Sequence, residues 1–272
     1  MLVSHESPIS MLPVSLGYND YDYALVHLFE THPEYYKFFK DSLKNGREVL
    51  LDNSIFELGT AFDSNKFYNY ILDLKPTYYV VPDVLEDTNG TIESFTRWVN
   101  EHNLEPIKHI PKIGVVQGTT FSELAECYSF MATNADYVAI SFDYSYYQIT
   151  GLGTNKLQRQ KSGRIKLIKD LVDAGIWDKS KPHHLLGCSL PDEFRSYMGG
   201  DYTYSAERLN IRSLDTSNPV VAGMHNIRYI NGIGLVDKLS IKLCDLIDYK
   251  VTEENKDNIL FNANQFKKLN YI

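Results

Sequence analysis

The feature that most constrains this chain is a repeated succession of a short strand-like run, a polar loop and an amphipathic, helix-like stretch. The predicted strands are residues 48–54, 77–84, 112–118, 137–145, 184–189 and 211–217. The predicted helices are residues 62–75, 91–103, 121–134, 164–176 and 190–199, and several begin near a Ser, Thr or Asp at an N-cap position. Strands separated by helices pair in parallel through right-handed crossovers, and their continuous apolar character indicates burial on both faces. The pattern therefore predicts an α/β fold.

Two α/β architectures fit this pattern, a doubly wound open sheet and a closed (β/α)8 barrel. A length of 272 residues is normal for one barrel. Strands at LPVSLG (12–17) and near NIRYING (226–232) would complete a set of eight. No Pro/Ser-rich linker or low-complexity tract divides the sequence. We therefore predict a (β/α)8 TIM barrel that forms a single domain over residues 1–272, with helical packing over 235–272.

Composition excludes several classes of protein. A chain that is 43% hydrophobic and 23% charged is an ordinary folded protein. Its three cysteines, Cys127, Cys188 and Cys244, are far apart and form no CxxC pair, so we expect no disulfide framework, no metal and a reducing cytoplasmic location. The N-terminus does not resemble a signal peptide, and no apolar run approaches eighteen residues, so we expect neither export nor a membrane partner.

The net charge of −8 argues against a chain that coats nucleic acid indiscriminately, because that binding depends on neutralising phosphates. One local segment is nevertheless strongly basic. Residues 154–169, TNKLQRQKSGRIKLIK, contain no acid and are called the basic segment here. We predict that it contacts phosphates through Lys156, Arg159, Lys161 and Arg164. The alternative is a solvated helix face next to a loop.

Polar residues gather at the predicted C-terminal ends of the strands, which form the reaction face of a parallel α/β fold. These ends carry Asp52 with Asn53 and Ser54, then Asp83, Gln117, Asp143, Cys188 with Ser189, and Asp215. A single Asp at such a junction is often only an N-cap or turn residue, and this alternative stays open for Asp52 and Asp143. Carboxylates that share one opening raise each other's pKa, so one can donate a proton while another stays ionised.

These acids favour chemistry performed by carboxylates. No Walker loop, Rossmann glycine fingerprint or GxSxG elbow is present, and we expect no cofactor. GLG at 151–153 is too short a glycine motif to indicate phosphate binding. Covalent glycosidic displacement needs one carboxylate as nucleophile and a second group as acid/base or acceptor. The sequence therefore favours a glycosyl-transfer enzyme.

Five motifs, taken in order, resemble the tRNA-guanine transglycosylase superfamily, whose members exchange a guanine in nucleic acid for a 7-deazaguanine base. The motifs are LLDNSIFELG (50–59), VVPDVLED (80–87), GVVQG (114–118), HLLGCSLPDEF (184–194) and SLDTSNP (213–219). The first departs from the family's Asp-Ser-Gly-Gly-Phe-Gln stretch, because Asn53, Ser54 and Ile55 replace the serine and the paired glycines. The resemblance covers about residues 50–220.

The resemblance implies a role for each matching position. Asp215, with Pro219 four residues on, matches the nucleophile that attacks C1′ of the target nucleotide. Asp83 and Gln117 match the acid and the amide that bind the purine edge. Asp52 becomes a proton shuttle or an orienting acceptor. We further assign Asp143, Gly187, Cys188 and Tyr144 to substrate binding, with base stacking by Tyr144 weighed against ordinary core packing.

The resemblance also bears on the substrate. The family's zinc site of three cysteines and one histidine has no counterpart in this sequence. Shorter relatives that act on DNA also lack it, so we favour DNA over tRNA as the partner, with a 7-deazaguanine base such as a preQ-type precursor as the second substrate. The alternatives are a hydrolase that removes a base and a non-catalytic partner subunit. His183 and His184 precede a predicted strand and are interpreted as structural.

Overall fold

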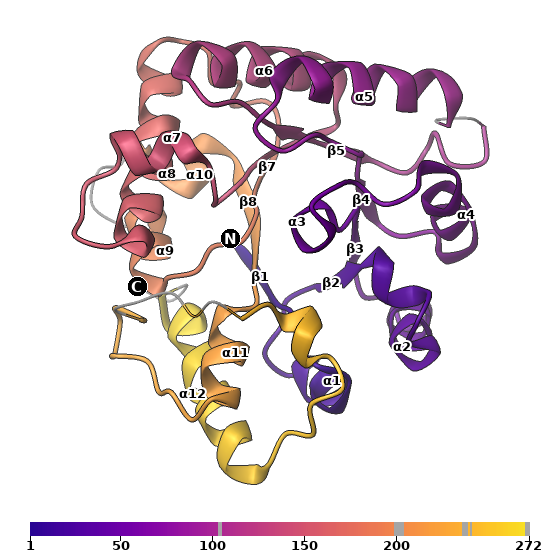
Figure 1. Ribbon diagram of the computed structural model, residues 1–272, viewed down its shortest axis with the longest axis vertical. Coiled ribbons are helices and arrows are strands. Elements are labelled where there is room, and N and C mark those ends of the chain that lie inside the picture. Colours follow the sequence, from indigo (N-terminus) through magenta and orange to yellow (C-terminus); the bar gives the residue numbers. More distant parts are fainter. Residues whose placement is uncertain (103–104, 199–203, 236–238, 240, 270–272) are drawn as a thin grey trace. The chain divides into compact units, whose positions relative to one another are not determined.

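Eight parallel strands alternating with helices form a nearly closed (β/α)8 barrel (Figure 1), which confirms the predicted fold class. The computed structural model describes residues 1–102, 105–198, 204–235, 239 and 241–269. The strands are β1 (Leu2–His5), β2 (Asp22–Leu25), β3 (Val49–Asp52), β4 (Tyr78–Val80), β5 (Lys112–Val116), β6 (Tyr137–Ile140), β7 (His183–Leu185) and β8 (Ile211–Thr216). Their order in the sheet is β1-β8-β7-β6-β5-β4-β3-β2.

Six of the eight strands lie where the sequence predicts them, and the other two predictions are wrong. Residues Leu12–Ser15 form a short helix, α1, with Pro13 in its first turn, and the strands that complete the set are β1 and β2. Residues 226–232 form no strand, and Ile230 makes only an isolated β-bridge to Gly234. β1 and β2 contain four residues each, and such short runs give little periodic signal.

Helices follow most strands, as the barrel pattern requires. The longer ones are α2 (Pro33–Lys44), α4 (Ser64–Leu74), α5 (Thr88–Glu101), α6 (Phe121–Asn134), α8 (Lys156–Asp173), α9 (Pro191–Met198) and α12 (Glu253–Leu269). Short helices are α3 (Ile55–Leu58), α7 (Ser145–Thr150), α10 (Ala206–Leu209), α11 (Asn218–Met224) and the 3₁₀ turns η1 (Ile9–Met11), η2 (Val26–Phe29) and η4 (Leu243–Leu246). No helix in the described ranges combines the length and the apolar character needed to cross a bilayer.

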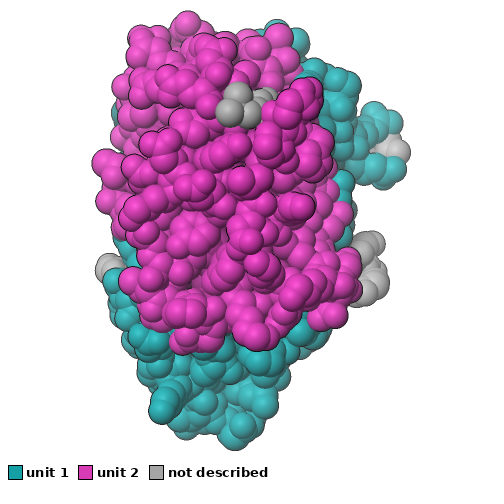
Figure 2. Space-filling model, turned by 90° about the vertical axis from the view of Figure 1, so that its right-hand side faces the viewer, with its two compact units in different colours: residues 1–20, 142–272 teal, residues 21–141 magenta. Residues whose placement is uncertain are grey.

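The chain groups into two compact units, coloured separately in Figure 2. Unit 1 comprises residues 1–20 and 142–272, and unit 2 comprises residues 21–141. The prediction of a single domain stays a prediction. The predicted helical packing over 235–272 is met by η4 and α12, while residues 236–238, 240 and 270–272 lie outside the described residues.

Unit 2 contains β2 to β6, which pair in parallel in chain order. Trp98 of α5 donates to the hydroxyl of Tyr79 on β4 at 3.2 Å and packs against Phe67 of α4, which fixes these helices on the sheet. Asp63 caps α4, and Thr120 with Glu123 forms a capping box at the start of α6. These caps satisfy the backbone donors at the helix ends and set where each βα loop stops.

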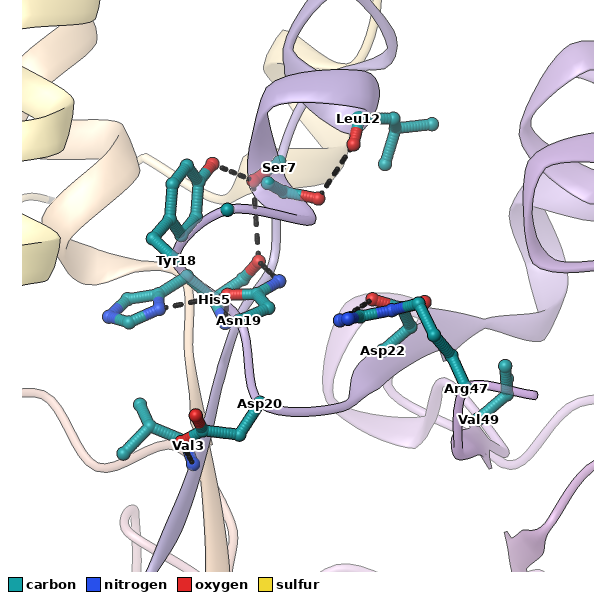
Figure 3. Close-up of polar contacts among 12 residues, drawn as sticks. Val3, His5, Ser7, Leu12, Tyr18, Asn19, Asp20, Asp22, Arg47 and Val49 are labelled. Atoms are coloured by element: carbon teal, nitrogen blue, oxygen red, sulfur yellow. Dashed lines mark hydrogen bonds and ion pairs between the residues drawn. The ribbon is translucent and has the colours of Figure 1, made fainter. Parts of the chain in front are cut away.

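Unit 1 contains β7, β8 and β1, with β8 paired in parallel to both neighbours. α11 and α12 lie side by side around a core that includes Val220, Met224 and Ile259 (Figure 1). The segment after β1 is held by buried polar contacts: the Asn19 side chain accepts from the His5 amide at 2.7 Å, and Ser7 bonds the Tyr18 hydroxyl at 2.7 Å (Figure 3). These contacts position the C-terminal end of β1.

Candidate active site

In unit 2, three side chains from neighbouring strand ends form a buried hydrogen-bonded group, called the amide–carboxylate cluster here. Asp83 follows β4 and is 3% exposed. Asn53, after β3, donates to Asp83 Oδ1 at 2.7 Å, and Gln117, after β5, donates to Asp83 Oδ2 at 2.7 Å. Adjacent parallel strands end at the same edge, so their following residues meet. The sequence prediction that Asp83 and Gln117 lie close together is correct.

The amide oxygens of the cluster are also engaged. Gln117 Oε1 accepts the backbone N–H of Glu86 at 2.9 Å, and Asn53 Oδ1 accepts that of Ile55 at 2.9 Å. Each amide is thereby fixed with its NH₂ group toward Asp83. A carboxylate has about four acceptor positions. The Asp83 backbone N–H also donates to this carboxyl, so one acceptor position remains for a ligand beyond these three donors.

Burial raises the pKa of the Asp83 carboxyl, and the hydrogen bonds from Asn53 and then Gln117 lower it in part. The amides thus offset some of the desolvation cost of an anion at this position. Asp52 lies beside the cluster in sequence, at the end of β3, and its Oδ2 accepts the Ser54 N–H at 2.7 Å. Ser54 has φ of 61°, in the left-handed region that glycine adopts most easily.

In unit 1, Asp215 is held by a second group, called the histidine–carboxylate cluster here. Asp215 lies on β8 one residue before its end and is 3% exposed. His184 Nε2 lies 3.0 Å from Asp215 Oδ1, and the Gly187 N–H donates to Oδ1 at 3.1 Å and Oδ2 at 3.2 Å. Ser213 Oγ lies 2.9 Å from His184 Nδ1. This cluster is a carboxylate with fixed donors.

Gly187 has φ of 65°, a conformation that disfavours residues with a Cβ, and this bend directs its N–H toward Asp215. The prediction that the two histidines precede the strand is wrong, and the interpretation of them as structural stays a prediction. β7 begins at His183, so His184 lies within the strand and contacts Asp215, while His183 stacks on Trp177 with ring centroids 3.8 Å apart. The available signal was a pair of adjacent histidines in a strand, whose side chains must point to opposite faces.

Asp143 and Tyr144 follow β6 in sequence and belong to unit 1. Asp143 forms an ion pair with Lys156 at 3.1 Å and accepts from Gln160, so it ties the start of α8 to the loop before α7. Tyr144 is 1% exposed and packs against Tyr147 with ring centroids 5.1 Å apart. Its ring lies in the core of unit 1, as in the packing alternative.

Cys188 also lies in the core of unit 1. Burial, and then the negative charge of Glu193, raise the pKa of its thiol well above the usual value. The thiol is therefore neutral at physiological pH and is a poor nucleophile. Its backbone N–H donates to the Asp215 carbonyl oxygen at 2.8 Å, so the residue supports the strand end rather than presenting its sulfur.

The basic segment forms the loop before α8 and most of that helix, and its cations differ in exposure. Arg164 is fully buried and donates to both oxygens of Glu193, at 2.7 and 3.0 Å. Lys161 pairs with Asp192, and Lys156 pairs with Asp143. Arg159 donates to neutral oxygens, those of Gln148 and Gly153. Lys156 keeps half of its side chain exposed, whereas Arg164 lies inside the protein.

No group of three or more His, Cys, Asp or Glu side chains in the described part of the chain is arranged to hold a metal ion. Neither a scan against protein-family models nor a search of curated proteins finds a match to the sequence.

Proposed function

We propose that this protein is a nucleic-acid guanine transglycosylase that exchanges guanine for a 7-deazaguanine base through a covalent bond to Asp215. The observation that carries the proposal is the position of Asp215: a buried carboxylate near the C-terminal end of a barrel strand, held by a backbone N–H and an imidazole. Catalytic residues of (β/α)8 enzymes come from that end of the strands. The resemblance of SLDTSNP to the family's nucleophile motif adds to this.

The exchange consists of two displacements. In the first, an electron pair of the Asp215 carboxylate forms a bond to C1′, the C1′–N9 bond breaks, and its electron pair leaves with guanine, which takes up a proton. In the second, the incoming base loses a proton and bonds C1′, and the pair of the ester bond returns to Asp215. Two displacements retain the configuration at C1′ and avoid a free oxocarbenium ion that water would trap.

The amide–carboxylate cluster suits recognition of a purine. Guanine and 7-deazaguanines present adjacent N–H donors on one edge, and Asp83 keeps an acceptor position for such a donor beside its bonds from Asn53, Gln117 and its own backbone N–H. Discrimination by buried hydrogen-bonding groups is strong, because an analogue without the donors leaves them unpaired. Phe56 follows the same loop in α3 and is 45% exposed, and we propose it as the residue that stacks on the base.

Asp52 is proposed as the proton shuttle of the reaction or as an orienting acceptor. Ser54, at the position where the family has a glycine, adopts the left-handed conformation that glycine favours, which supports a similar loop shape despite the changed residues. The Ser54 N–H donates to Oδ2 of Asp52 and so orients this carboxylate.

DNA is proposed as the polymer in preference to tRNA, because the family's zinc ligands have no counterpart in the sequence. A base must leave its stack to reach such a site, at a cost of about a few kcal/mol. Lys156, Arg159 and Lys161 are the proposed phosphate contacts. Arg164 is left out of this set because its guanidinium is bound inside unit 1.

The test is mass spectrometry of nucleosides from duplex DNA and from tRNA, each incubated with the protein and a labelled 7-deazaguanine. We expect the label in DNA nucleosides and none with Asp215→Ala. Release of guanine without incorporation would indicate a hydrolase, and incorporation into tRNA alone would reverse the choice of polymer. Reversing Lys156, Arg159 and Lys161 to Glu is expected to weaken DNA binding and reduce its salt dependence, because fewer counterions are released.

A further inference from the structure

The two nitrogens of the His184 ring are both engaged, which fixes the ring in one orientation. Nε2 contacts Asp215 Oδ1 at 3.0 Å, and Nδ1 contacts Ser213 Oγ at 2.9 Å. The side chain of His184 is fully buried. In the neutral ring, with the Ser213 hydroxyl donating to Nδ1, the ring proton lies on Nε2. In the imidazolium form, both ring nitrogens carry protons. In both cases Nε2–H donates to Asp215.

The strand pairing around His184 is irregular in a way that directs this side chain. His183 is opposite Ile211, whereas His184 is opposite Ser213, so the register shifts by one residue between them. Such bulges bend a strand locally and change the direction of a side chain, and they are frequent next to active sites. The shift places His184 opposite Ser213, which precedes Asp215 by two residues. From there the imidazole ring contacts the side chains of both Ser213 and Asp215.

The donors on Asp215 are unequally divided between its oxygens. Oδ1 accepts from His184 and from the Gly187 N–H at 3.1 Å, while Oδ2 accepts from the Gly187 N–H at 3.2 Å. Each hydrogen bond withdraws electron density from the oxygen that accepts it. Oδ2 is therefore the more nucleophilic of the two oxygens and the less restrained.

We propose that His184 is the positioning residue of the reaction, holding Asp215 by Oδ1 so that Oδ2 attacks C1′. This inference rests on the proposed function. The electron pair of Oδ2 forms the bond to C1′ while the pair of the C1′–N9 bond leaves with guanine. Oδ1 then becomes the ester carbonyl oxygen and keeps its bond from His184. In the second displacement, negative charge returns to the carboxylate, and the same donor stabilises it.

His184 acts through Asp215 in this scheme. It neither accepts the leaving proton nor contacts the base, because its Nε2 is directed at the carboxylate. Ser213 has a secondary role, since its hydroxyl prevents the ring from rotating. Small errors in the placement of a reacting group can cost about a hundredfold in rate. An effect of that kind is expected in kcat rather than in substrate affinity.

The experiment compares His184→Leu, which removes the donor, with His184→Gln, whose amide NH₂ restores one. His183→Gln is the matched control, because His183 is the neighbouring buried histidine of β7 and stacks on Trp177. Steady-state exchange gives kcat and KM, and single-turnover reactions with labelled DNA and no incoming base give the rate of the covalent adduct. Thermal melting confirms that each variant is folded.

We expect His184→Leu to lower kcat and the rate of adduct formation about a hundredfold, with KM within about threefold of the wild-type value. His184→Gln is expected to recover about tenfold of the lost rate. If His184→Leu does not fold, Ser213→Ala, which frees the ring, takes its place with an expected loss of about tenfold. A folded His184→Leu with the rates of His183→Gln would overturn the inference and leave the proposed function intact. Absence of both exchange and adduct in the wild-type protein would overturn the two together.

Discussion

The central carboxylates of the two clusters are equally buried, yet they have different partners. Asp83 in unit 2 and Asp215 in unit 1 are each 3% exposed. Asp83 receives one strong amide donor on each oxygen, at 2.7 Å. Asp215 receives an imidazole and a backbone N–H, concentrated on Oδ1.

The difference teaches that burial alone does not assign a role to an acid. A carboxylate bound evenly by two fixed amides is oriented as an acceptor, and such an acceptor is suited to an N–H group of a base. A carboxylate held mainly by one oxygen has its other oxygen available for bond formation. The proposed function assigns recognition to Asp83 and bond formation to Asp215, and variants of the two residues distinguish these roles.

The largest effect is expected for Asp215→Asn. The amide keeps the shape of the side chain but cannot form the ester, so we expect exchange to fall by about 10⁴-fold or more. Single-turnover reactions followed by denaturing gels should show no covalent adduct. Asp83→Asn is the matched variant in the other unit and should still form adduct from guanine-containing DNA. Equal loss of adduct in both variants would contradict this assignment of roles.

The next effect concerns stability. Arg164 and Glu193 form a fully buried bidentate pair in unit 1, while Asp22 and Arg47 form a bidentate pair in unit 2 whose arginine is 25% exposed (Figure 3). Arg164→Met leaves Glu193 buried without its partner and is expected to lower the free energy of unfolding by about 3–5 kcal/mol. Arg47→Met should cost less, because water reaches that pair.

Chemical denaturation measures both changes. Combining Arg164→Met with Glu193→Leu removes both buried charges and is expected to recover most of the stability lost in the single variant. A stable Arg164→Met protein with weakened DNA binding would instead restore Arg164 to the set of phosphate contacts.

The basic segment shows where sequence reasoning stops. Its cations can be read from the sequence, but their partners cannot, because Glu193 lies 29 residues beyond Arg164 and meets it only through the packing of α9 against α8. Helical periodicity alone would not separate a buried arginine from exposed lysines on the same helix. The contacts of β7 are equally hidden, since the one-residue register shift that brings His184 to Ser213 leaves no trace in either strand's composition.

What the sequence does predict follows from simple physics. Long apolar runs with polar ends indicate buried parallel strands, and polar residues after adjacent strands must meet at one edge. The pattern correctly predicts that Asp83 and Gln117 lie close together. It failed for β1 and β2 because LVSH and DYAL are short and mixed in character. Their strand conformation comes from pairing with neighbouring strands, as β1 pairs with β8 and β2 with β3.

The third prediction concerns the pH dependence of stability that two buried histidines cause. Burial lowers the pKa of His5 to about 4, against hydrogen bonding by Asn19, and burial lowers the pKa of His183 to about 4. Both histidines belong to unit 1. Between pH 6.5 and 4 the unfolded chain binds protons that the folded chain does not, so stability falls as the pH falls through this window. The cost at pH 4 is about 3 kcal/mol for each histidine.

Denaturation at pH 7, 6, 5 and 4 tests this for His5→Gln. The variant is expected to be less sensitive to pH than the wild-type protein by about 3 kcal/mol over the range. His225→Gln, at an exposed position of the same unit, is the matched control. An identical pH dependence in His5→Gln and the wild type would show that His5 is protonated in the folded state.

The smallest effect is expected for Asp83→Asn on base affinity. The variant loses charge-assisted hydrogen bonds to the base, so KM for the incoming 7-deazaguanine should rise about thirtyfold, or ~2 kcal/mol, with a smaller change in the adduct rate. The effect is limited because Asn53 and Gln117 are fixed by the backbone N–H groups of Ile55 and Glu86 and still shape the cluster.

The same variant should also change how the stability of the protein depends on pH. Since burial raises the pKa of Asp83, the folded protein binds this proton more tightly than the unfolded chain, and stability falls as the pH rises from about 4 through the folded pKa. Asp83→Asn should lack this slope. A variant that keeps the wild-type KM would remove Asp83 from base recognition and leave its role as a structural acceptor for the two amides.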